Sequence, residues 1–198
     1  MKFTYKSNIK KRLFFGVSLF LFLGAFAQVK YTNKNNVALT VSGTSTLHDW
    51  DMKTNQGSCD ATFSFNAANG ISGITGLSFV TPATALKSGH EAMDKNAYKA
   101  LKTDKAASIS YTASAATVTA VDATDYLVKS TGKLTIAGAT LDAEVIATCK
   151  INADKSITVM GSKKISMKDF SMSPPSFMMG TIKTGDDVTI KFDLKMSK

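Results

Sequence analysis

Residues 188–196 read Val-Thr-Ile-Lys-Phe-Asp-Leu-Lys-Met, an unbroken alternation of apolar and polar side chains. Successive side chains of an extended strand point to opposite faces, so this stretch predicts a β-strand with one apolar and one polar face. The same period of two recurs along the chain at residues 37–42, 59–65, 77–81, 108–113, 126–136, 141–150, 157–159 and 165–167. Turn-forming residues separate these runs, as at Ala68-Asn69-Gly70 and Thr184-Gly185-Asp186-Asp187.

One segment has a different period. Between residues 88 and 103 the apolar positions recur at intervals of three and four: Met93, Ala97, Tyr98 and Leu101. This spacing predicts a short amphipathic helix, and Ser88 followed by Glu91 predicts a capping box at its start. The chain is therefore expected to be all-β and antiparallel with one short α-helix. The alternation alone allows either a closed barrel or a stacked sandwich.

The N-terminus has the features of a signal peptide. Residues 2–12 are basic, residues 13–27 are almost all apolar, and the run ends in Ala25-Phe26-Ala27. This pattern predicts cleavage after Ala27 and export of residues 28–198 to the periplasm or the exterior as a single domain. The alternative is an N-terminal membrane anchor, but a span needs about 20 apolar residues, so the mature chain is not expected to cross a membrane.

Removal of this segment also changes the charge of the chain. The 198 residues carry 24 basic and 15 acidic side chains, a net charge of +9. Five of the basic residues and no acidic residue precede residue 28, and Arg12 is the only arginine. Arginine is the preferred residue for phosphate and base recognition, so no nucleic-acid partner is expected.

The two cysteines allow two interpretations. Cys59 and Cys149 are the only cysteines, and an even pair in an oxidising compartment predicts a disulfide. The alternative is two buried free thiols, since cysteine is among the most frequently buried residues.

Side chains for catalysis or metal binding are few. The two histidines, His48 and His90, have no metal-ligand spacing, and no Gly-x-Ser-x-Gly or phosphate-loop pattern occurs. Lys163-Lys164 is interpreted as a solvated pair. We therefore expect no enzyme, no metal site and no catalytic residues.

Four stretches together resemble the YceI-like family, whose members form an extended lipocalin-like barrel. They are Val41–Trp50, Met93–Lys102 running into Ala107–Tyr111, Gly132–Thr140, and Lys168–Met172 with Pro174-Pro175 and the final strand. The resemblance implies an exported protein that encloses a long-chain isoprenoid-type lipid, either a quinone or a polyprenyl chain. The absence of arginine from the mature chain favours a neutral quinone over a diphosphate.

Two groups of apolar residues are the candidate lipid-binding residues. The first lies on the apolar faces of the strands, where small residues leave room beside large ones: Phe63, Phe65, Phe79, Tyr111, Val145 and Phe192. The second lies in the segment 170–182, which could form a lid over the barrel mouth: Phe170, Met172, Phe177 and Met178. The alternatives are ordinary packing of a tapered barrel and of a loop that closes its core.

The sequence thus predicts a lipid carrier or lipid-sequestering protein with no cofactor beyond that lipid. The alternative is an envelope structural or interaction protein whose barrel is fully packed. The sequence does not fix the oligomeric state, and a homodimer is one of the states that it allows.

Overall fold

The computed structural model describes residues 1, 27–34 and 36–198, so the predicted signal peptide lies outside the described residues apart from its two ends. The strands are β1 (Ala27–Lys34), β2 (Val37–Ser45), β3 (Trp50–Thr54), β4 (Ser58–Phe65), β5 (Ile71–Pro82), β6 (Ser108–Ala120), β7 (Asp125–Ile136), β8 (Ala139–Ile151), β9 (Ile157–Ser166), β10 (Ser176–Phe177) and β11 (Ile182–Met196). The helices are α1 (Glu91–Ala100) and the single 3₁₀ turns η1 (Ala83–Ala85), η2 (Lys168–Phe170) and η3 (Met178–Gly180).

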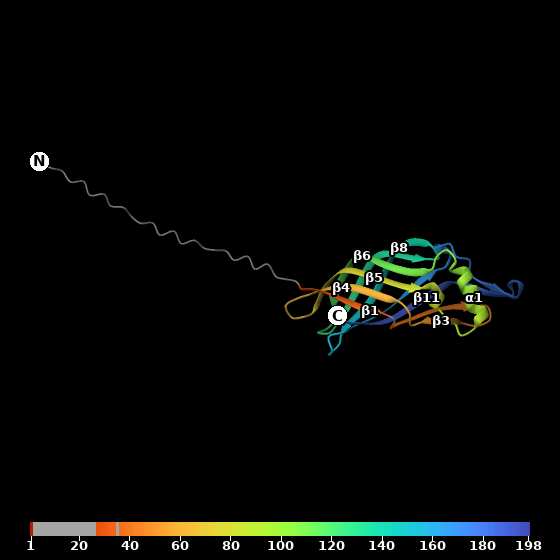
Figure 1. Ribbon diagram of the computed structural model, residues 1–198, viewed down its shortest axis with the longest axis horizontal. Coiled ribbons are helices and arrows are strands. Elements are labelled where there is room, and N and C mark those ends of the chain that lie inside the picture. The colour runs from red at the N-terminus through yellow and green to blue at the C-terminus, as the bar shows by residue number, and fades with distance from the viewer. Residues whose placement is uncertain (2–26, 35) are drawn as a thin grey trace.

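The strands form one antiparallel sheet that closes on itself as a barrel (Figure 1). Pairing proceeds in the order β1-β4-β5-β6-β7-β8-β9-β11-β2-β3, while the short β10 pairs only with β11. Strand β1 continues into β2, and β3 continues into β4, so these four strands form the two arms of one long hairpin. The strands at the two ends of the pairing order, β1 and β3, therefore belong to the same hairpin, which closes the sheet. Thr32 of β1 also forms a bridge with Ser197 directly after β11. The predicted all-β barrel is therefore confirmed, and the sandwich is not formed.

Strand β11 runs the length of the barrel and contains the unbroken alternation of residues 188–196. Val188, Leu194 and Met196 are buried on its inner face, whereas Lys191 and Asp193 are exposed on its outer face. The same alternation is complete in β7, where buried and non-buried residues follow one another from Tyr126 to Ile136. An inner face of this kind buries apolar side chains along the barrel axis, and this burial is the main force that stabilises the fold.

The helix forms where its period predicted, but its start differs from the expected capping box. Helix α1 begins at Glu91 after His90, and the carboxylate that caps the preceding turn belongs to Asp94. Asp94 Oδ1 accepts hydrogen bonds from the backbone N–H of Ser88 at 2.8 Å and from its hydroxyl at 2.7 Å. The Ser88–Glu91 box was therefore wrong, because Ser88 lies two residues before the N-cap and reaches a carboxylate one turn further along.

Candidate functional site

A large apolar cavity lies under α1, which Figure 1 shows at one end of the barrel. Its volume is about 530 Å³, which lies within the ~300–1,000 Å³ typical of small-molecule sites. The walls are apolar side chains that include residues of β2, β3, β6, β7, β9 and β11: Val41, Trp50, Met52, Ile109, Ile136, Ile165, Val188 and Ile190. Protein interiors are packed about as densely as organic crystals, so a void of this size is not ordinary core packing.

Helix α1 roofs this cavity without filling it. Its lining residues Ala92, Ala97 and Ala100 have side chains too short to reach far into the barrel, and Met93 is the one long apolar side chain among the helical residues that line the cavity. Of the apolar stripe predicted from the sequence, Met93, Ala97 and Leu101 therefore face the cavity rather than a solid core, whereas Tyr98 does not line it.

Several polar contacts fix α1 over the mouth. The Tyr98 hydroxyl lies 2.8 Å from the carbonyl oxygens of both Thr84 and Leu86, and Lys102 Nζ donates to the Ser171 carbonyl at 2.8 Å. Lys87 pairs with Asp94 at 3.7 Å. Partial burial works against ionisation of Asp94, but the hydrogen bonds from Ser88 and the charge of Lys87 outweigh it and lower the Asp94 pKa. The roof is thus anchored at both ends of the helix.

A second wall of the mouth is the hairpin formed by β10 and β11. Ser176 pairs with Lys183 and Phe177 pairs with Ile182, while the Thr184 N–H donates to the Pro175 carbonyl at 3.0 Å. The Thr46 N–H donates to the Lys183 carbonyl at 3.0 Å, which ties the hairpin to the β2–β3 turn. Met172, Pro175, Phe177 and Met178 all line the cavity. The segment predicted as a lid therefore does lie at the barrel mouth.

The polar groups of the cavity are few and belong mainly to its rim: Ser45, His48, His90, Asn96 and Thr184. His48 and His90 are both exposed, and His48 Nδ1 lies 2.6 Å from the Asp49 carbonyl oxygen. The two histidines are far apart in the sequence, and only the fold brings both to the same cavity. The site thus offers an apolar interior and a small number of hydrogen-bonding groups at its opening.

A smaller cavity of about 120 Å³ lies deeper in the barrel. It shares Val41, Ile109 and Ile190 with the larger cavity, so these three side chains form the partition between them. Two polar groups on its wall are buried and satisfy each other, since the Tyr111 hydroxyl donates to Ser130 Oγ at 3.0 Å. Burial raises the pKa of Tyr111, so this hydroxyl stays protonated.

Lys163 is also part of the inner wall. It is half-buried and pairs across the sheet with the inward-facing Ile190, whereas Lys164 points outward and pairs with Asp187 at 2.7 Å. The interpretation of Lys163-Lys164 as a solvated pair was therefore wrong for Lys163. Alternation places one of two adjacent lysines inside, where its aliphatic stem covers apolar surface.

The opposite end of the barrel is filled with large side chains. The rings of Tyr31 and Phe63 meet edge to face with centroids 5.4 Å apart, and Phe65 lies 6.1 Å from Tyr31. Phe63 is 1 % exposed, and Val37, Ile157 and Met196 are as deeply buried. This end of the barrel is closed by packing, so the mouth under α1 is the way into the larger cavity.

The ten candidate lipid-binding residues fall into three places. Met172, Phe177 and Met178 line the large cavity. Phe63, Phe79, Tyr111, Val145 and Phe192 line the small one. Phe65 and Phe170 line neither, since Phe65 packs against Tyr31 at the closed end and Phe170 is 3 % exposed in η2. Contact of any of these residues with a lipid stays a prediction.

The two cysteines are brought together from strands that are distant in sequence. Both line the small cavity and both are free, buried thiols in the described structure. Burial raises the pKa of each to about 12, helped by the charge of Asp60 at Cys59 and by Cys59 itself at Cys149. The predicted disulfide stays a prediction, which titration of free thiols in the denatured, non-reduced protein would test.

Most of the cavity wall could not be identified from the sequence. Ile136, Ile165 and Met167 were predicted only as strand positions, Met52 belonged to no predicted strand, and of the lining alanines of α1 only Ala97 belonged to the predicted stripe. The periodicity of the predicted positions marked them as buried but did not separate residues that touch a cavity from residues that touch each other.

Within residues 27–34 and 36–198, no helix has the length and apolar character needed to cross a membrane.

Comparison with known proteins places the chain in a family. The profile of the YceI-like domain matches residues 24–196, so the chain belongs to the YceI-like family. A search of curated protein sequences gives no match.

Solved structures share the fold at low identity. The crystal structure of Burkholderia cenocepacia BcnA has a TM-score of 0.63 and 16% identity, and the match covers 82% of this chain and 96% of that one. A polyisoprenoid binding domain from Saccharophagus degradans, implicated in plant cell wall breakdown, has a TM-score of 0.62 and 12% identity over 86% and 99% of the two chains. The Campylobacter jejuni YceI protein has a TM-score of 0.51 and 19% identity over 71% and 81%.

Proposed function

We propose that this protein binds a long-chain isoprenoid-type lipid, a quinone or a polyprenyl chain, and that it carries or sequesters this lipid outside the cytoplasm. The observation that carries the proposal is the cavity of about 530 Å³ with apolar walls under α1. Membership of the YceI-like family and the fold shared with a polyisoprenoid binding domain support the choice of ligand class.

The chemistry of the cavity suits a ligand that is mostly hydrocarbon. Burial of apolar groups contributes about 0.8 kcal/mol for each CH₂ removed from water, so a prenyl tail can bind tightly with few polar contacts. The rim groups His48, His90 and Asn96 can hydrogen-bond to a neutral headgroup. The mature chain has no arginine to hold a diphosphate in a bidentate contact, which favours a quinone or an uncharged prenyl headgroup.

The alternative function is a structural or interaction protein with a fully packed barrel. The cavity under α1 favours lipid binding over this alternative, because a barrel that only displays its surface gains nothing from an open interior. An enzyme is not proposed, since the rim offers two exposed histidines and no nucleophile held against a base.

The direct test is organic extraction of the purified protein followed by mass spectrometry, with titration of geranylgeraniol and a short-chain ubiquinone onto the extracted protein. We expect a prenyl lipid in the extract and saturable binding of both probes. An empty extract together with no uptake of either probe would contradict the proposal.

A cavity-filling variant places the binding site. Ala97→Trp puts an indole into the mouth, and we expect binding of geranylgeraniol to fall at least about tenfold while the melting temperature changes little. Ala38→Trp is the matched control, because Ala38 is exposed on the outer face of β2. Equal binding by both variants would mean that the ligand lies elsewhere.

Export is a separate part of the proposal. We expect N-terminal sequencing of the protein from an envelope or culture-fluid fraction to begin at Gln28. A mature protein that retains residues 1–27 would instead favour the membrane anchor.

A further inference from the structure

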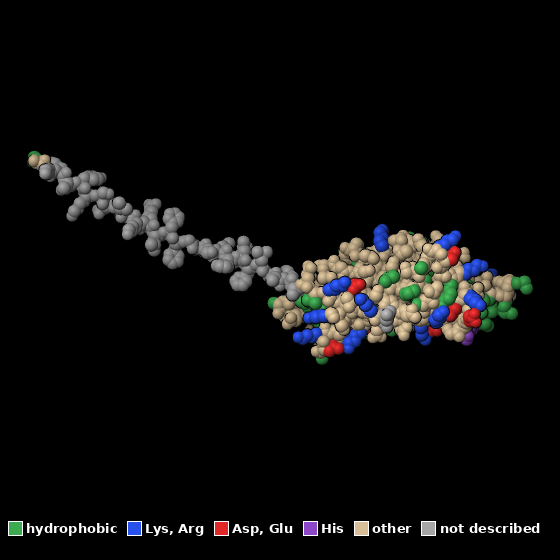
Figure 2. All heavy atoms as spheres, viewed as in Figure 1, with side chains coloured by type: hydrophobic (Ala, Val, Ile, Leu, Met, Phe, Trp, Pro, Cys, Tyr) green, Lys and Arg blue, Asp and Glu red, His purple; other side chains and the backbone are tan. Residues whose placement is uncertain are grey.

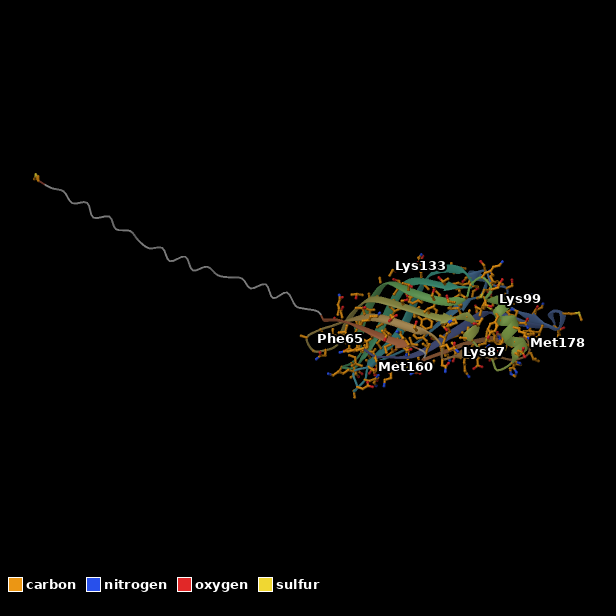
Figure 3. All side chains as sticks on the ribbon, in the orientation of Figure 1. Phe65, Lys87, Lys99, Lys133, Met160 and Met178 are labelled. Carbon is orange, nitrogen blue, oxygen red and sulfur yellow. The ribbon has the colours of Figure 1, made fainter. Side chains whose placement is uncertain are left out.

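The two most exposed large apolar residues of the described barrel, Met178 and Met179, lie at the mouth of the cavity. Met178 and Met179 are 75 % and 108 % exposed at the tip of the β10–β11 hairpin, and Leu47 of the β2–β3 turn is 66 % exposed. We call residues 177–180 the apolar prong. Figure 3 shows Met178 at the tip of the end that carries α1, and Figure 2 shows hydrophobic side chains gathered there.

The backbone of the prong makes these side chains unexpected. Met178, Met179 and Gly180 are consecutive left-handed residues with φ of 48°, 53° and 88°. Such positions favour glycine or asparagine, and a long apolar side chain there gains nothing from the fold while it is exposed to water. Exposed apolar groups of this kind mark contact with a membrane or another partner.

The prong is continuous with the cavity. Leu47 and Met178 are mostly exposed and yet also line the cavity, and the half-buried Phe177 lies between the tip and the interior. An apolar surface therefore runs without a break from outside the barrel into its interior. A hydrocarbon chain that follows this surface does not have to cross water.

Two segments beside the cavity mouth carry excess positive charge. The adjoining segments 97–105 and 168–183 contain five lysines (Lys99, Lys102, Lys105, Lys168 and Lys183) and two acidic residues (Asp104 and Asp169). The contact of Lys102 with the Ser171 carbonyl brings the two segments together. Among the ion pairs of the described residues, none involves these five lysines, whereas nine lysines elsewhere are paired.

We propose that the prong and these lysines dock the protein onto a lipid bilayer that contains anionic lipids, with the cavity mouth facing the membrane. The methionines enter the boundary between headgroups and acyl chains, and the lysines contact the phosphates around them. Docking brings the mouth to the surface from which a lipid would be taken or to which it would be delivered. The proposal goes beyond lipid binding itself, because docking does not depend on which lipid the cavity holds.

Sedimentation with vesicles tests the prong. Parent protein and Met179→Glu are mixed with vesicles of phosphatidylcholine and phosphatidylglycerol, and we expect the variant to bind at least about tenfold more weakly, as expected when one methionine is no longer buried. Met160→Glu is the matched control, since Met160 is 42 % exposed on the barrel wall away from the mouth (Figure 3). All proteins carry the same N-terminus, so its contribution is common to them.

A second pair of variants tests the lysines. Lys99→Gln with Lys183→Gln should remove most of the preference for vesicles with phosphatidylglycerol over vesicles of phosphatidylcholine alone, together with the weakening of binding by salt. Lys34→Gln with Lys191→Gln removes the same charge from exposed positions elsewhere on the barrel. This control pair should leave the preference unchanged.

The proposal would be overturned if the parent protein bound to neither vesicle, or if Met179→Glu and Met160→Glu bound equally well. It would also be overturned if the protein did not bind vesicles and instead formed a dimer, seen by analytical ultracentrifugation, that Met179→Glu abolished. The last would assign the prong to a second copy of this chain. Geranylgeraniol binding in vesicle-free buffer is measured on the same variants. Met179, Lys99 and Lys183 do not line the cavity, so loss of docking with binding retained separates this proposal from the proposed function.

Discussion

The two ends of this barrel share strands such as β9 and β11 and yet have opposite character. At the closed end, Tyr31, Phe63 and Phe65 pack ring against ring, and the cavity that Phe63 borders has a volume of about 120 Å³. At the mouth, the alanines of α1 cover a cavity of about 530 Å³. The difference shows that the sheet encloses the interior volume, while the size of the inward side chains decides how much of this volume stays empty.

The largest effect should come from the closed end. Phe63→Ala removes a ring that is 1 % exposed, and we expect a loss of about 3–5 kcal/mol in the free energy of unfolding, measured by denaturant titration. A loss below about 1 kcal/mol would mean that this end is not a rigid core.

An intermediate loss of stability is expected on the wall of the small cavity. Ser130→Ala removes the acceptor of the buried Tyr111 hydroxyl, and an unsatisfied buried group of this kind costs about 1–3 kcal/mol. Tyr111→Phe is the partner variant. If the hydrogen bond carries the effect, the double variant should be no less stable than Ser130→Ala alone, whereas additive losses would contradict it.

The mouth should tolerate truncation. Met93→Ala removes a half-buried side chain that faces the cavity, so we expect a loss of at most about 1 kcal/mol, below the 2–5 kcal/mol usual for buried methionine. Thermal or denaturant unfolding of Met93→Ala and Phe63→Ala under the same conditions measures both losses of stability. A loss as large as that of Phe63→Ala would show that α1 is packed as tightly as the closed end.

The smallest expected effect is a change in the pH dependence of the melting temperature, and it concerns a turn at the closed end. Lys195 and the Ser156 hydroxyl and N–H hydrogen-bond to Asp154, and these contacts hold its pKa well below the usual value of about 3.9. A lowered pKa in the folded state gives stability that is present above the unfolded pKa and is lost as the pH falls through the folded pKa. The melting-temperature gap between parent and Asp154→Asn should therefore narrow as the pH falls below about 4. The same narrowing for Asp104→Asn, an exposed carboxylate in no ion pair of the described residues, would contradict this assignment.

Alternation predicted most of the barrel strands because each has one face in the core. It missed β1, where the buried inward position Asn33 is polar and breaks the apolar series, and β3, whose buried inward positions include the polar Thr54. It also divided β9 into two pieces, because Gly161 and Lys163 occupy inward positions between Val159 and Ile165. A period of two is visible in the sequence only where the inward side chains are apolar and the outward ones polar. These residues lie on the inner face without being large and apolar, so they interrupt the period.

The candidate site was predictable in part for the same reason. Met172, Phe177 and Met178 could be assigned to the mouth from their composition, but Phe65 and Phe170 have equally apolar surroundings in sequence and line no cavity. The sequence states which side chains avoid water. It does not state which of them find a neighbour and which face an empty volume.

The sequence by itself therefore determined most of the strands, the helix and the family, because period and motif are properties of consecutive residues. Only the tertiary structure decided that β1–β2 closes the sheet, that α1 roofs the mouth, and that Cys59 meets Cys149 inside. Closure, enclosed volume and an exposed prong beside a cavity depend on residues distant in sequence meeting across the barrel, and no local pattern encodes such a meeting.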